Sequence, residues 1–273
     1  MLQISKKYPS KRAFITGAGS GLGKAFALQL AKDNWQIGIT DLTEKNVLQT
    51  AEEIAAVGGK AFHYVFDVSD KTAFSTAVDD FISKNNGIDL IINNAGVGDG
   101  GLFGEYSLEN WDWILGINLR GVVYGSHLAA IAMKKQQSGT IINIASAAGF
   151  ANAPSMSMYN VPKAGVVSLS ESIFPELKAY NVHVAVVMPT FFKTNIMQHH
   201  RGDDFSAKVG QAYIDKSNLL PDAVAHRVLE KAANKKFYIY IPFVSGFLAV
   251  IKRIMPNAFL HIKYLIFKKK LNR

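Results

Sequence analysis

A glycine-rich turn between two apolar segments constrains the fold of this chain more than any other feature. Arg12–Thr16 is a short apolar run that ends at Gly17-Ala-Gly-Ser-Gly-Leu-Gly23. Residues 24–32 have a helical mix of apolar and polar side chains, and residues 35–40 predict a second strand. Strand, glycine turn, helix and strand form the βαβ unit that binds dinucleotides. Glycines let the pyrophosphate approach the helix N-terminus, where free N–H groups favour an anion.

Strand-like and helix-like segments continue to alternate along the chain. Further strands are predicted at 61–66, 88–92, 140–145, 182–188 and 237–241, with helices at 70–84, 109–133, 158–178 and 221–233. This order predicts an α/β fold with a doubly wound parallel sheet of the Rossmann type in a single domain. We expect this domain to cover 1–243, followed by a basic, apolar C-terminal extension at 244–273.

The end of the second predicted strand bears on the choice of cofactor. Asp41 lies 18 residues after Gly23 (41 − 23), where a carboxylate can accept hydrogen bonds from both ribose hydroxyls and repel a 2′-phosphate. The alternative is that Asp41 is the N-cap of the helix that follows. Ser20 precedes Gly21 where a basic residue could have met that phosphate. NAD is therefore favoured, and NADP stays possible. Asp67, followed by Val68, is placed to border the adenine.

Tyr159 and Lys163 are four residues apart on a predicted helix, and Ser146 lies thirteen residues before Tyr159 (159 − 146). Such spacing puts the ammonium and the phenol on one helix face. A phenol has a free pKa of about 10, and a nearby positive charge favours the phenolate. A serine hydroxyl from another element could hold a substrate oxygen against it. This is the pattern of a proton-transfer site for an alcohol or carbonyl, although a surface pair is the alternative for the spacing alone.

With these motifs in order, the chain resembles the single-domain branch of the short-chain dehydrogenase/reductase family. The motifs are Thr16-Gly17-x-x-x-Gly21-x-Gly23, Asn93-Asn94-Ala95-Gly96, Asn118, Ser146 and Tyr159-x-x-x-Lys163, and the resemblance extends over about 11–194. It places catalysis on Asn118, Ser146, Tyr159 and Lys163. It places cofactor contacts on Gly17, Ser20, Gly21, Leu22, Gly23, Asp41, Asp67, Val68, Asn94, Ala95, Gly96, Tyr159, Lys163, Pro189 and Thr194.

In that family the tyrosine is the acid/base, the serine orients the substrate oxygen, the lysine lowers the tyrosine pKa and binds the nicotinamide ribose, and the asparagine supports a proton relay. The resemblance thus implies an NAD(P)-dependent oxidoreductase that interconverts a primary or secondary alcohol and its aldehyde or ketone. It also implies a homodimer or homotetramer, and it places the family's variable substrate loop at about 195–220 of the catalytic domain. Pro189 is followed by Thr190 where the family usually has glycine, which predicts a modest adjustment beside the nicotinamide. The alternative function is a dinucleotide-sensing or scaffold protein without catalysis, although such proteins typically lose one of the catalytic residues.

Composition excludes several other classes. The chain has no cysteine, which excludes disulfides, thiolate metal sites and cysteine nucleophiles. Its first residues lack the apolar core of a signal peptide, and no uninterrupted apolar stretch reaches the roughly 20 residues of a membrane span. We therefore expect a cytoplasmic protein, attached to a membrane surface at most. His199 and His200 are adjacent but have no further ligands nearby in sequence, so no metal site is expected.

The positive charge of the chain is concentrated at its end. Glu230 is the last acidic residue, and ten Lys and Arg follow it, so residues 1–230 carry 20 basic and 21 acidic groups (30 − 10 and 21). Residues 247–267 are largely apolar, and Lys268-Lys-Lys270 follows them. This tail suits the surface of an anionic membrane, or alternatively packing over the pocket or a neighbouring subunit. Nucleic-acid binding is not expected, because the basic residues form no stripe with stacking aromatics. A tail that meets lipid would favour an apolar substrate, such as a long-chain alcohol, an aldehyde, a sterol or a retinoid.

Overall fold

Seven strands form one parallel sheet in the computed structural model, which describes residues 1–271. They are β1 Arg12–Thr16, β2 Gln36–Asp41, β3 Lys60–Val65, β4 Leu90–Asn93, β5 Gly139–Ile144, β6 Val182–Pro189 and β7 Tyr238–Ile241. Their order is β3-β2-β1-β4-β5-β6-β7, and every neighbouring pair is parallel. The strand order changes direction between β1 and β4, which is the point where doubly wound sheets bind ligands. The predicted Rossmann-type fold is confirmed.

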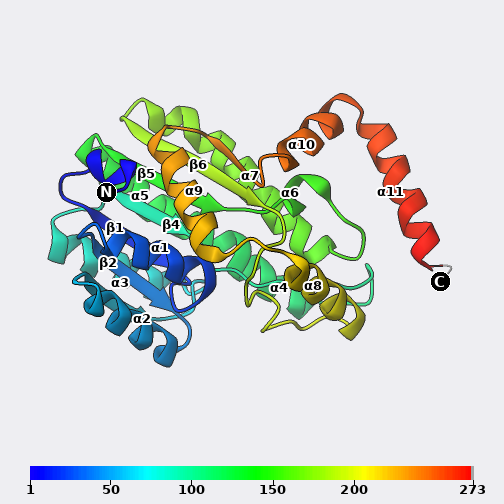
Figure 1. Cartoon of the computed structure of the whole chain (residues 1–273), viewed down its shortest axis with the longest axis horizontal. Helices are drawn as coiled ribbons and strands as arrows, with labels where there is room; N and C mark the ends of the chain where they lie inside the picture. Colours follow the sequence, from blue (N-terminus) through cyan, green and yellow to red (C-terminus); the bar gives the residue numbers. More distant parts are fainter. Residues whose placement is uncertain (272–273) are drawn as a thin grey trace.

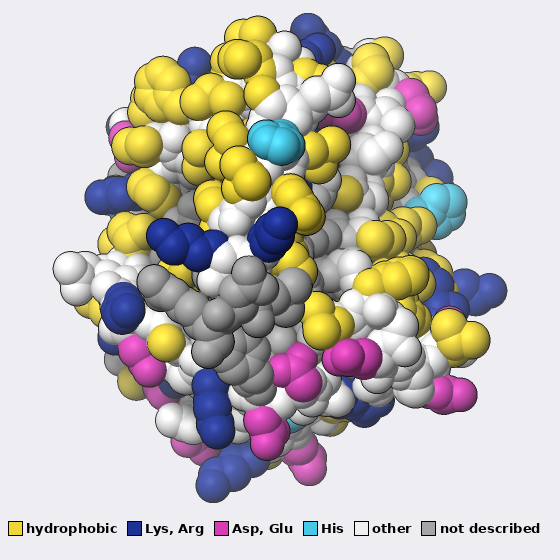
Figure 2. All heavy atoms as spheres, turned by 90° about the vertical axis from the view of Figure 1, so that its right-hand side faces the viewer, with side chains coloured by type: hydrophobic (Ala, Val, Ile, Leu, Met, Phe, Trp, Pro, Cys, Tyr) yellow, Lys and Arg dark blue, Asp and Glu magenta, His cyan; other side chains and the backbone are white. Residues whose placement is uncertain are grey.

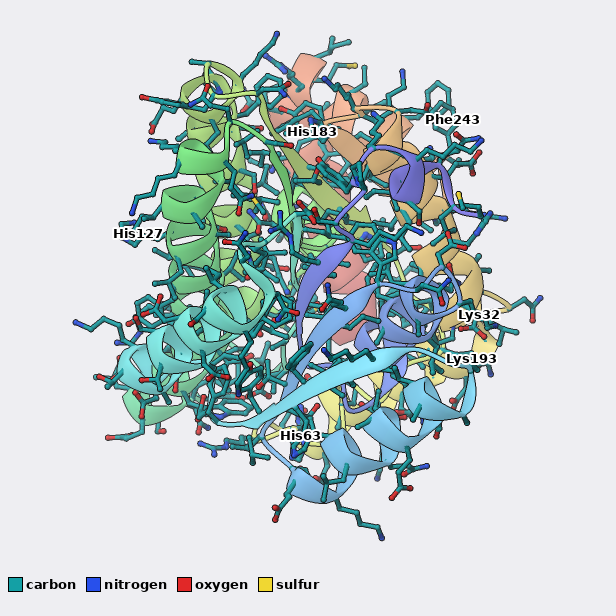
Figure 3. All side chains as sticks on the ribbon, turned by 90° about the vertical axis from the view of Figure 1, so that its left-hand side faces the viewer. Lys32, His63, His127, His183, Lys193 and Phe243 are labelled. Atoms are coloured by element: carbon teal, nitrogen blue, oxygen red, sulfur yellow. The ribbon has the colours of Figure 1, made fainter. Side chains whose placement is uncertain are left out.

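Helices cover both faces of the sheet (Figures 1 and 3). On one face α1, α2 and α9 pack together, and α3, α5 and α7 cover the other. The helical segments are η1 Gln3–Lys6, α1 Gly21–Ala31, α2 Glu44–Ala56, α3 Lys71–Asn85, α4 Leu108–Leu115, η2 Gly116–Arg120, α5 Gly121–Gln136, α6 Ala148–Ala151, α7 Ser157–Lys178, α8 Asp204–Lys216, α9 Pro221–Ala233, α10 Ser245–Ile254 and α11 Pro256–Leu271.

The central strands are buried on both faces, as parallel strands between two helical layers must be. In β1, Ala13 and Ile15 face the cluster of α1 and α9, while Phe14 faces the cluster of α3 and α5. Trp35 is fully buried beside the N-terminal segment and donates its indole N–H to Ser5 Oγ at 2.8 Å. Burying one such large side chain stabilises the fold by about 1.5–3 kcal/mol. The alternation of buried side chains along each strand therefore fixes which of them face each helical layer.

Element boundaries agree with the sequence expectation to within a few residues, and the differences have local causes. Asp70 caps α3 by accepting hydrogen bonds from the N–H groups of Thr72 and Ala73, so the helix begins one residue later than expected. The expected helix 109–133 is part of a continuous helix over Leu108–Gln136 that contains the π-helical turn η2. Among residues 1–271 this helix alone is long and apolar enough to cross a bilayer, and 44% of its most apolar window is buried in the fold.

The chain ends in two helices that extend beyond the sheet. In Figure 1, α10 leaves the body after β7, and α11 runs away from it toward the C-terminus. The expected division of the chain at residue 243 coincides with the start of this helical pair, and it stays a prediction as a domain boundary.

Candidate active site

The glycine turn closes between β1 and the N-terminus of α1. Gly17 has a φ of +63°, a left-handed conformation that L side chains rarely adopt. A Cβ on Gly23 would lie 2.1 Å from the carbonyl oxygen of Gly17, so only glycine fits there. Ser20 is the N-cap residue of α1 but its side chain makes no capping hydrogen bond. The turn thus leaves the first N–H groups of α1, from Gly21 and Leu22 onward, without a side-chain acceptor, which suits a phosphate.

Asp41 ends β2 beside this turn. Its Oδ2 accepts a hydrogen bond from the N–H of Gly19 at 3.1 Å, and its Oδ1 accepts one from the N–H of Thr43 at 3.1 Å. Thr43, not Asp41, is the N-cap residue of α2, so the alternative helix-capping role is wrong. The carboxylate is half-buried at the edge of the glycine turn.

The carboxyl ends of β3 and β4 border the same side of the sheet. Asp67 accepts hydrogen bonds from the backbone N–H and the hydroxyl of Ser69, both at 2.8 Å, and Val68 is buried. Asn94 donates its amide N–H to the carbonyl oxygens of Thr16 at 2.9 Å and Gly17 at 3.1 Å. Thr16 Oγ1 in turn accepts from the backbone N–H groups of Asn94 and Ala95. Asn94 and Ala95 therefore tie β4 to the glycine turn.

Asn118 lies in the π-helical turn η2 and is fully buried. Its Oδ1 accepts from the N–H of Val97 at 2.9 Å, and its Nδ2 donates to the carbonyl of Val97 at 2.8 Å. A Cβ on Gly96 would lie 3.1 Å from Asn118 Oδ1 and 3.4 Å from Lys163 Nζ. The structure therefore brings Gly96, Asn118 and Lys163 together. Short π-helical turns inside α-helices are frequent at functional sites.

Ser146 follows β5 and points toward the start of α7. Its Oγ lies 3.5 Å from the carbonyl oxygen of Pro189 and accepts from the N–H of Ala148 at 3.1 Å. Thr190 donates its N–H to the carbonyl of Ile241 at 2.8 Å, which ties the segment after β6 to β7. Threonine at position 190, where the family usually has glycine, thus keeps the backbone hydrogen bond between the ends of β6 and β7.

Tyr159 and Lys163 are one turn apart on α7, and both are buried. Burial raises the pKa of the Tyr159 phenol to about 12, while its hydrogen bond with Ser146 opposes that rise. Burial lowers the pKa of the Lys163 ammonium to about 8. Lys163 Nζ donates to the carbonyl of Ile144 at 3.0 Å and lies 5.7 Å from the centre of the Tyr159 ring. The expected lowering of the tyrosine pKa is wrong for this arrangement, because desolvation of the phenol outweighs the opposing hydrogen bond with Ser146.

An apolar cluster surrounds Tyr159. Val97, Ile114 and Met158 are buried against it, and the half-buried residues packed around them come from the loop after β4, from α4 and from the substrate loop. They are Tyr106, Trp111, Trp113, Ile117, Ala148, Met156 and Ile196. The space beside the phenol is therefore bordered mainly by hydrocarbon and aromatic rings.

The substrate loop contains a contact that the sequence did not indicate. His200 Nδ1 lies 3.0 Å from Asp99 Oδ1, and both side chains are largely buried. Asp99 also accepts from the N–H groups of Gly100 and Gly202, each at 2.8 Å. The N–H of Gly98 donates to the carbonyl of Ile196 at 2.9 Å. Together these bonds hold the substrate loop against the loop after β4, whereas sequence alone suggested ordinary loop histidines.

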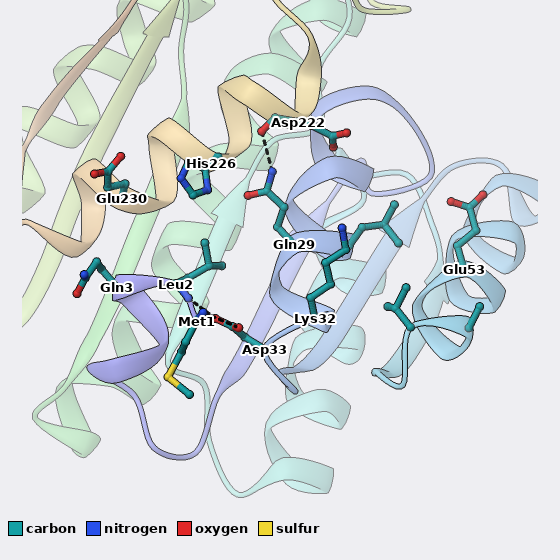
Figure 4. A pocket seen from close by; sticks show the side chains of 13 residues that line it. Met1, Leu2, Gln3, Gln29, Lys32, Asp33, Glu53, Asp222, His226 and Glu230 are labelled. Atoms are coloured by element: carbon teal, nitrogen blue, oxygen red, sulfur yellow. Dashed lines mark hydrogen bonds and ion pairs between the residues drawn. The ribbon is translucent and has the colours of Figure 1, made fainter.

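Two further observations bound the site. Thr194 Oγ1 lies 3.8 Å from the position of a Cβ on Gly21, so the expected nicotinamide-side residue faces the glycine turn. A cavity of about 910 Å³ lies elsewhere, among the N-terminus, α1, α2 and α9, and none of the expected site residues lines it (Figure 4). There Gln29 donates to the carbonyl of Asp222 at 2.6 Å. Within residues 1–271, no group of three or more metal-ligating side chains gathers.

Comparison with known proteins places this geometry in context. The family model for short chain dehydrogenase matches residues 11–204. The chain is 35% identical over 255 residues to the probable oxidoreductase EphD of Mycobacterium tuberculosis, which covers 89% of this chain and 43% of that protein. The chain thus spans less than half the length of that curated relative. It is 29% identical over 233 residues to the 3-oxoacyl-[acyl-carrier-protein] reductase FabG of Thermotoga maritima, covering 84% of this chain and 93% of FabG.

Solved structures agree with the sequence comparison. A short chain dehydrogenase/reductase from Burkholderia phymatum, crystallised in complex with NAD, superposes with a TM-score of 0.85 at 29% identity, covering 89% of this chain and 92% of that one. A short-chain type dehydrogenase/reductase from Mycobacterium marinum superposes with a TM-score of 0.74 at 29% identity, covering 84% and 93%.

Proposed function

The chain belongs to the short-chain dehydrogenase family of oxidoreductases, and we propose that it transfers a hydride between an apolar alcohol, or the matching carbonyl compound, and NAD. The observation that carries the proposal is the convergence of Ser146, Tyr159 and Lys163, in which the phenol is hydrogen-bonded to Ser146 and the Lys163 ammonium lies 5.7 Å from the centre of its ring. A phenol beside a hydroxyl that can orient the substrate oxygen, and near a positive charge, is suited to general acid/base catalysis.

The residues of the glycine turn fit a dinucleotide. Gly17 and Gly23 have no room for a side chain, α1 presents its N-terminus there, and Asp41 borders the turn. Asp41 would accept from the adenosine ribose hydroxyls, and Asp67 and Val68 would border the adenine. The nicotinamide end would lie near Pro189, Thr194 and Lys163. When bound, the cofactor supplies or accepts the hydride.

NAD is the better fit than NADP at this turn. The carboxylate of Asp41 would repel a 2′-phosphate, and Ser20 offers no positive charge. Lys24, four positions further along, forms an ion pair with Glu53 at 2.6 Å and so is already neutralised. The phosphate of NADP would therefore meet net negative charge at this edge.

The chain's own residues divide the proton chemistry among them. We assign Tyr159 as the group that takes the hydroxyl proton of an alcohol or returns it to a carbonyl oxygen. Ser146 would hold that oxygen by a hydrogen bond while also contacting the phenol. Lys163 would supply positive charge beneath the ring and bind the cofactor ribose. Both polar atoms of the Asn118 side chain form hydrogen bonds with the backbone of Val97. We therefore assign this side chain to positioning the loop that carries Gly96, which leaves the backbone of Asn118 for a role in a proton relay.

The substrate class follows from the lining of the site. Tyr159 belongs to a cluster of aromatic and aliphatic side chains, and such linings select apolar ligands with a few polar anchors. Among the relatives, FabG is named as a reductase of 3-oxoacyl groups, in which a carbonyl is attached to an acyl chain. We therefore propose a carbonyl or hydroxyl on a predominantly hydrocarbon chain or ring system as the substrate.

Association of like chains is part of the proposal, as expected for this family. Val123 and Ile131 on α5 and Val161 on α7 are exposed apolar residues on the long helices of one sheet face. Covering them in a dimer or tetramer would remove their hydrocarbon from water.

Tyr159→Phe tests the assignment directly. Wild-type protein is screened for NAD- and NADP-linked turnover over alcohols and ketones of increasing chain length, and the best substrate is then used with the variant. We expect Tyr159→Phe to lose about 100- to 10,000-fold in kcat with unchanged NADH affinity, because the phenolic proton is removed while the ring is kept. Tyr180→Phe, a surface substitution, is the matched control and should have wild-type rates. Turnover of Tyr159→Phe close to that of Tyr180→Phe would refute the assignment.

A further inference from the structure

Helix α10 turns its apolar side outward. Phe247, Leu248 and Ile251 are exposed, and Ile254 is 72% exposed. The apolar exposed positions in this segment recur at helical spacing and form one stripe, over residues 243, 244, 247, 248, 250, 251 and 254. A helix on the surface of a globular protein normally turns such a stripe toward the core. Here the residues that the structure describes leave the stripe uncovered.

The inward side of the helical pair combines polar contacts with two half-buried aromatic rings, Phe259 and Phe267. Ser245 is buried, and its hydroxyl donates to the carbonyl of Pro242 at 2.8 Å. On α11, Lys263 donates its ammonium to the carbonyl oxygens of Ala151 at 3.0 Å and Asn152 at 2.9 Å. A lysine that caps the end of α6 thus anchors α11 to the body, while most apolar side chains of the helical pair face away from it.

Helix α11 extends the apolar surface. Leu260, Ile262, Leu265 and Ile266 are exposed along it. Figure 2, which views the molecule from the side carrying these helices, shows hydrophobic side chains gathered over much of that face. We call the exposed apolar residues of 243–266, with the cations beside them, the tail surface.

The charges of this segment are all of one sign. Residues 244–273 contain seven basic residues and no acidic one, namely Lys252, Arg253, Lys263, Lys268, Lys269, Lys270 and Arg273. A second copy docked on the same surface by two-fold symmetry would bring these like charges together. An anionic lipid surface offers the complementary charge and accepts exposed hydrocarbon below its headgroups.

We propose that the tail surface of α10 and α11 docks the protein onto an anionic lipid membrane, lying in the interface without crossing it. Phe247, Ile251 and Ile254 enter the headgroup and acyl boundary, and the lysines contact lipid phosphates. The inference is independent of the hydride-transfer chemistry. Membrane docking would also give the hydride-transfer site a location in the cell. Phe267 of α11 lines a cavity of about 580 Å³ beside the N-terminal part of α7, the helix that carries Tyr159. Docking would therefore place the catalytic half of the molecule next to lipid.

Vesicle flotation of the full-length protein tests the proposal. Vesicles of phosphatidylcholine alone are compared with vesicles that contain about one third phosphatidylglycerol. We expect binding to the anionic vesicles about tenfold stronger than to the neutral ones, weakening as salt rises from about 0.1 to about 0.5 M. Absence of binding to the anionic vesicles would overturn the proposal.

Two paired variants separate the tail surface from the rest of the molecule. Phe247→Asp with Ile251→Asp should reduce binding about tenfold or more, whereas Leu48→Asp with Leu108→Asp introduces the same charge at exposed apolar positions elsewhere and should not. Equal loss in both pairs would refute the assigned surface. Circular dichroism and wild-type NAD-linked turnover show that each variant is folded.

A charge pair and an association measurement complete the design. Lys268→Glu with Lys269→Glu should weaken binding to anionic vesicles, and Lys71→Glu with Lys135→Glu, the control with the same net change, should not. Light scattering without vesicles tests whether a second copy of the chain covers the tail surface instead. If Phe247→Asp with Ile251→Asp lowers the oligomeric mass and leaves vesicle binding unchanged, the tail surface is an interface between copies and the membrane proposal is wrong.

Discussion

Replacing Lys163 by methionine should make the protein more stable while it abolishes turnover. Lys163 is 2% exposed, and burial lowers its pKa from 10.5 to about 8. At about 1.4 kcal/mol per pH unit, keeping this lysine charged in the folded protein at neutral pH costs about 3 kcal/mol relative to the unfolded chain. Methionine fills a similar volume without charge, so the variant avoids that cost.

The gain is partly offset by one lost hydrogen bond. Lys163 Nζ donates to the carbonyl of Ile144 at 3.0 Å, and leaving that carbonyl without its partner costs about 1–2 kcal/mol. We therefore expect Lys163→Met to be more stable by about 1–2 kcal/mol at about pH 7. At roughly 2–4 °C per kcal/mol, this is a rise in Tm of a few degrees.

The pH dependence of the difference identifies its cause. The folded-state pKa of Lys163 is lower than the unfolded one, so between about pH 8 and pH 10.5 the unfolded chain binds more protons and wild-type stability rises with pH. The advantage of Lys163→Met should therefore shrink from about pH 7 and be close to zero near pH 9.5.

Urea unfolding followed by tryptophan fluorescence, at about pH 7 and about pH 9.5, measures both quantities. Lys135→Met, at an exposed position, serves as the control and should change stability little at either pH. A variant that is less stable than wild type at neutral pH, or whose advantage is the same at both pH values, would refute the reasoning from burial.

Three further predictions concern the cofactor, the substrate loop and acid stability. Asp41→Ala removes the carboxylate beside the glycine turn and should shift the ratio of NADP- to NAD-linked kcat/KM by about tenfold toward NADP, as one lost charge repulsion of about 1.4 kcal/mol allows; an unchanged ratio would contradict the ribose role. Asp99→Ala removes the acceptor of His200 and Gly202 and should raise KM about tenfold with a smaller effect on kcat, in steady-state assays; unchanged KM would show that the loop does not depend on this contact. Burial lowers the pKa of His183 to about 4, so the unfolded chain binds more protons between about pH 6.5 and pH 4 and stability falls on acidification. His183→Gln should lose less stability than wild type in urea unfolding over that range, and an equal loss would contradict the prediction.

The fold and much of the candidate site could be predicted because their signals are local. The glycine turn between Arg12–Thr16 and α1 specifies its own backbone, since side chains at Gly17 and Gly23 do not fit. The spacing of Tyr159 and Lys163 fixes that both lie on one helix face. Strand alternation then places the ends of β1, β2 and β4 at the same edge of the sheet.

What could not be predicted depends on contacts between distant segments. Asp99 and Gly202 are 103 residues apart in sequence, and their hydrogen bond has no periodic signal. Helix α8, Asp204–Lys216, lies within the segment that was expected only as a substrate loop. The pKa of Tyr159 was misjudged for the same reason, since the spacing from Lys163 says nothing about how deeply the phenol is buried.

Burial of Lys163 also bears on whether the protein is an enzyme or a non-catalytic scaffold. A scaffold that only binds a dinucleotide would use this ammonium for the ribose contact alone, although keeping it charged costs about 3 kcal/mol and methionine at that position would be more stable. The same burial that shifts Lys163 also raises the pKa of Tyr159 to about 12, so desolvation disfavours the charged form of both groups. Proteins tolerate such strained groups where function requires them. The two opposed shifts, on one helix face and beside Ser146, therefore favour proton transfer over passive binding.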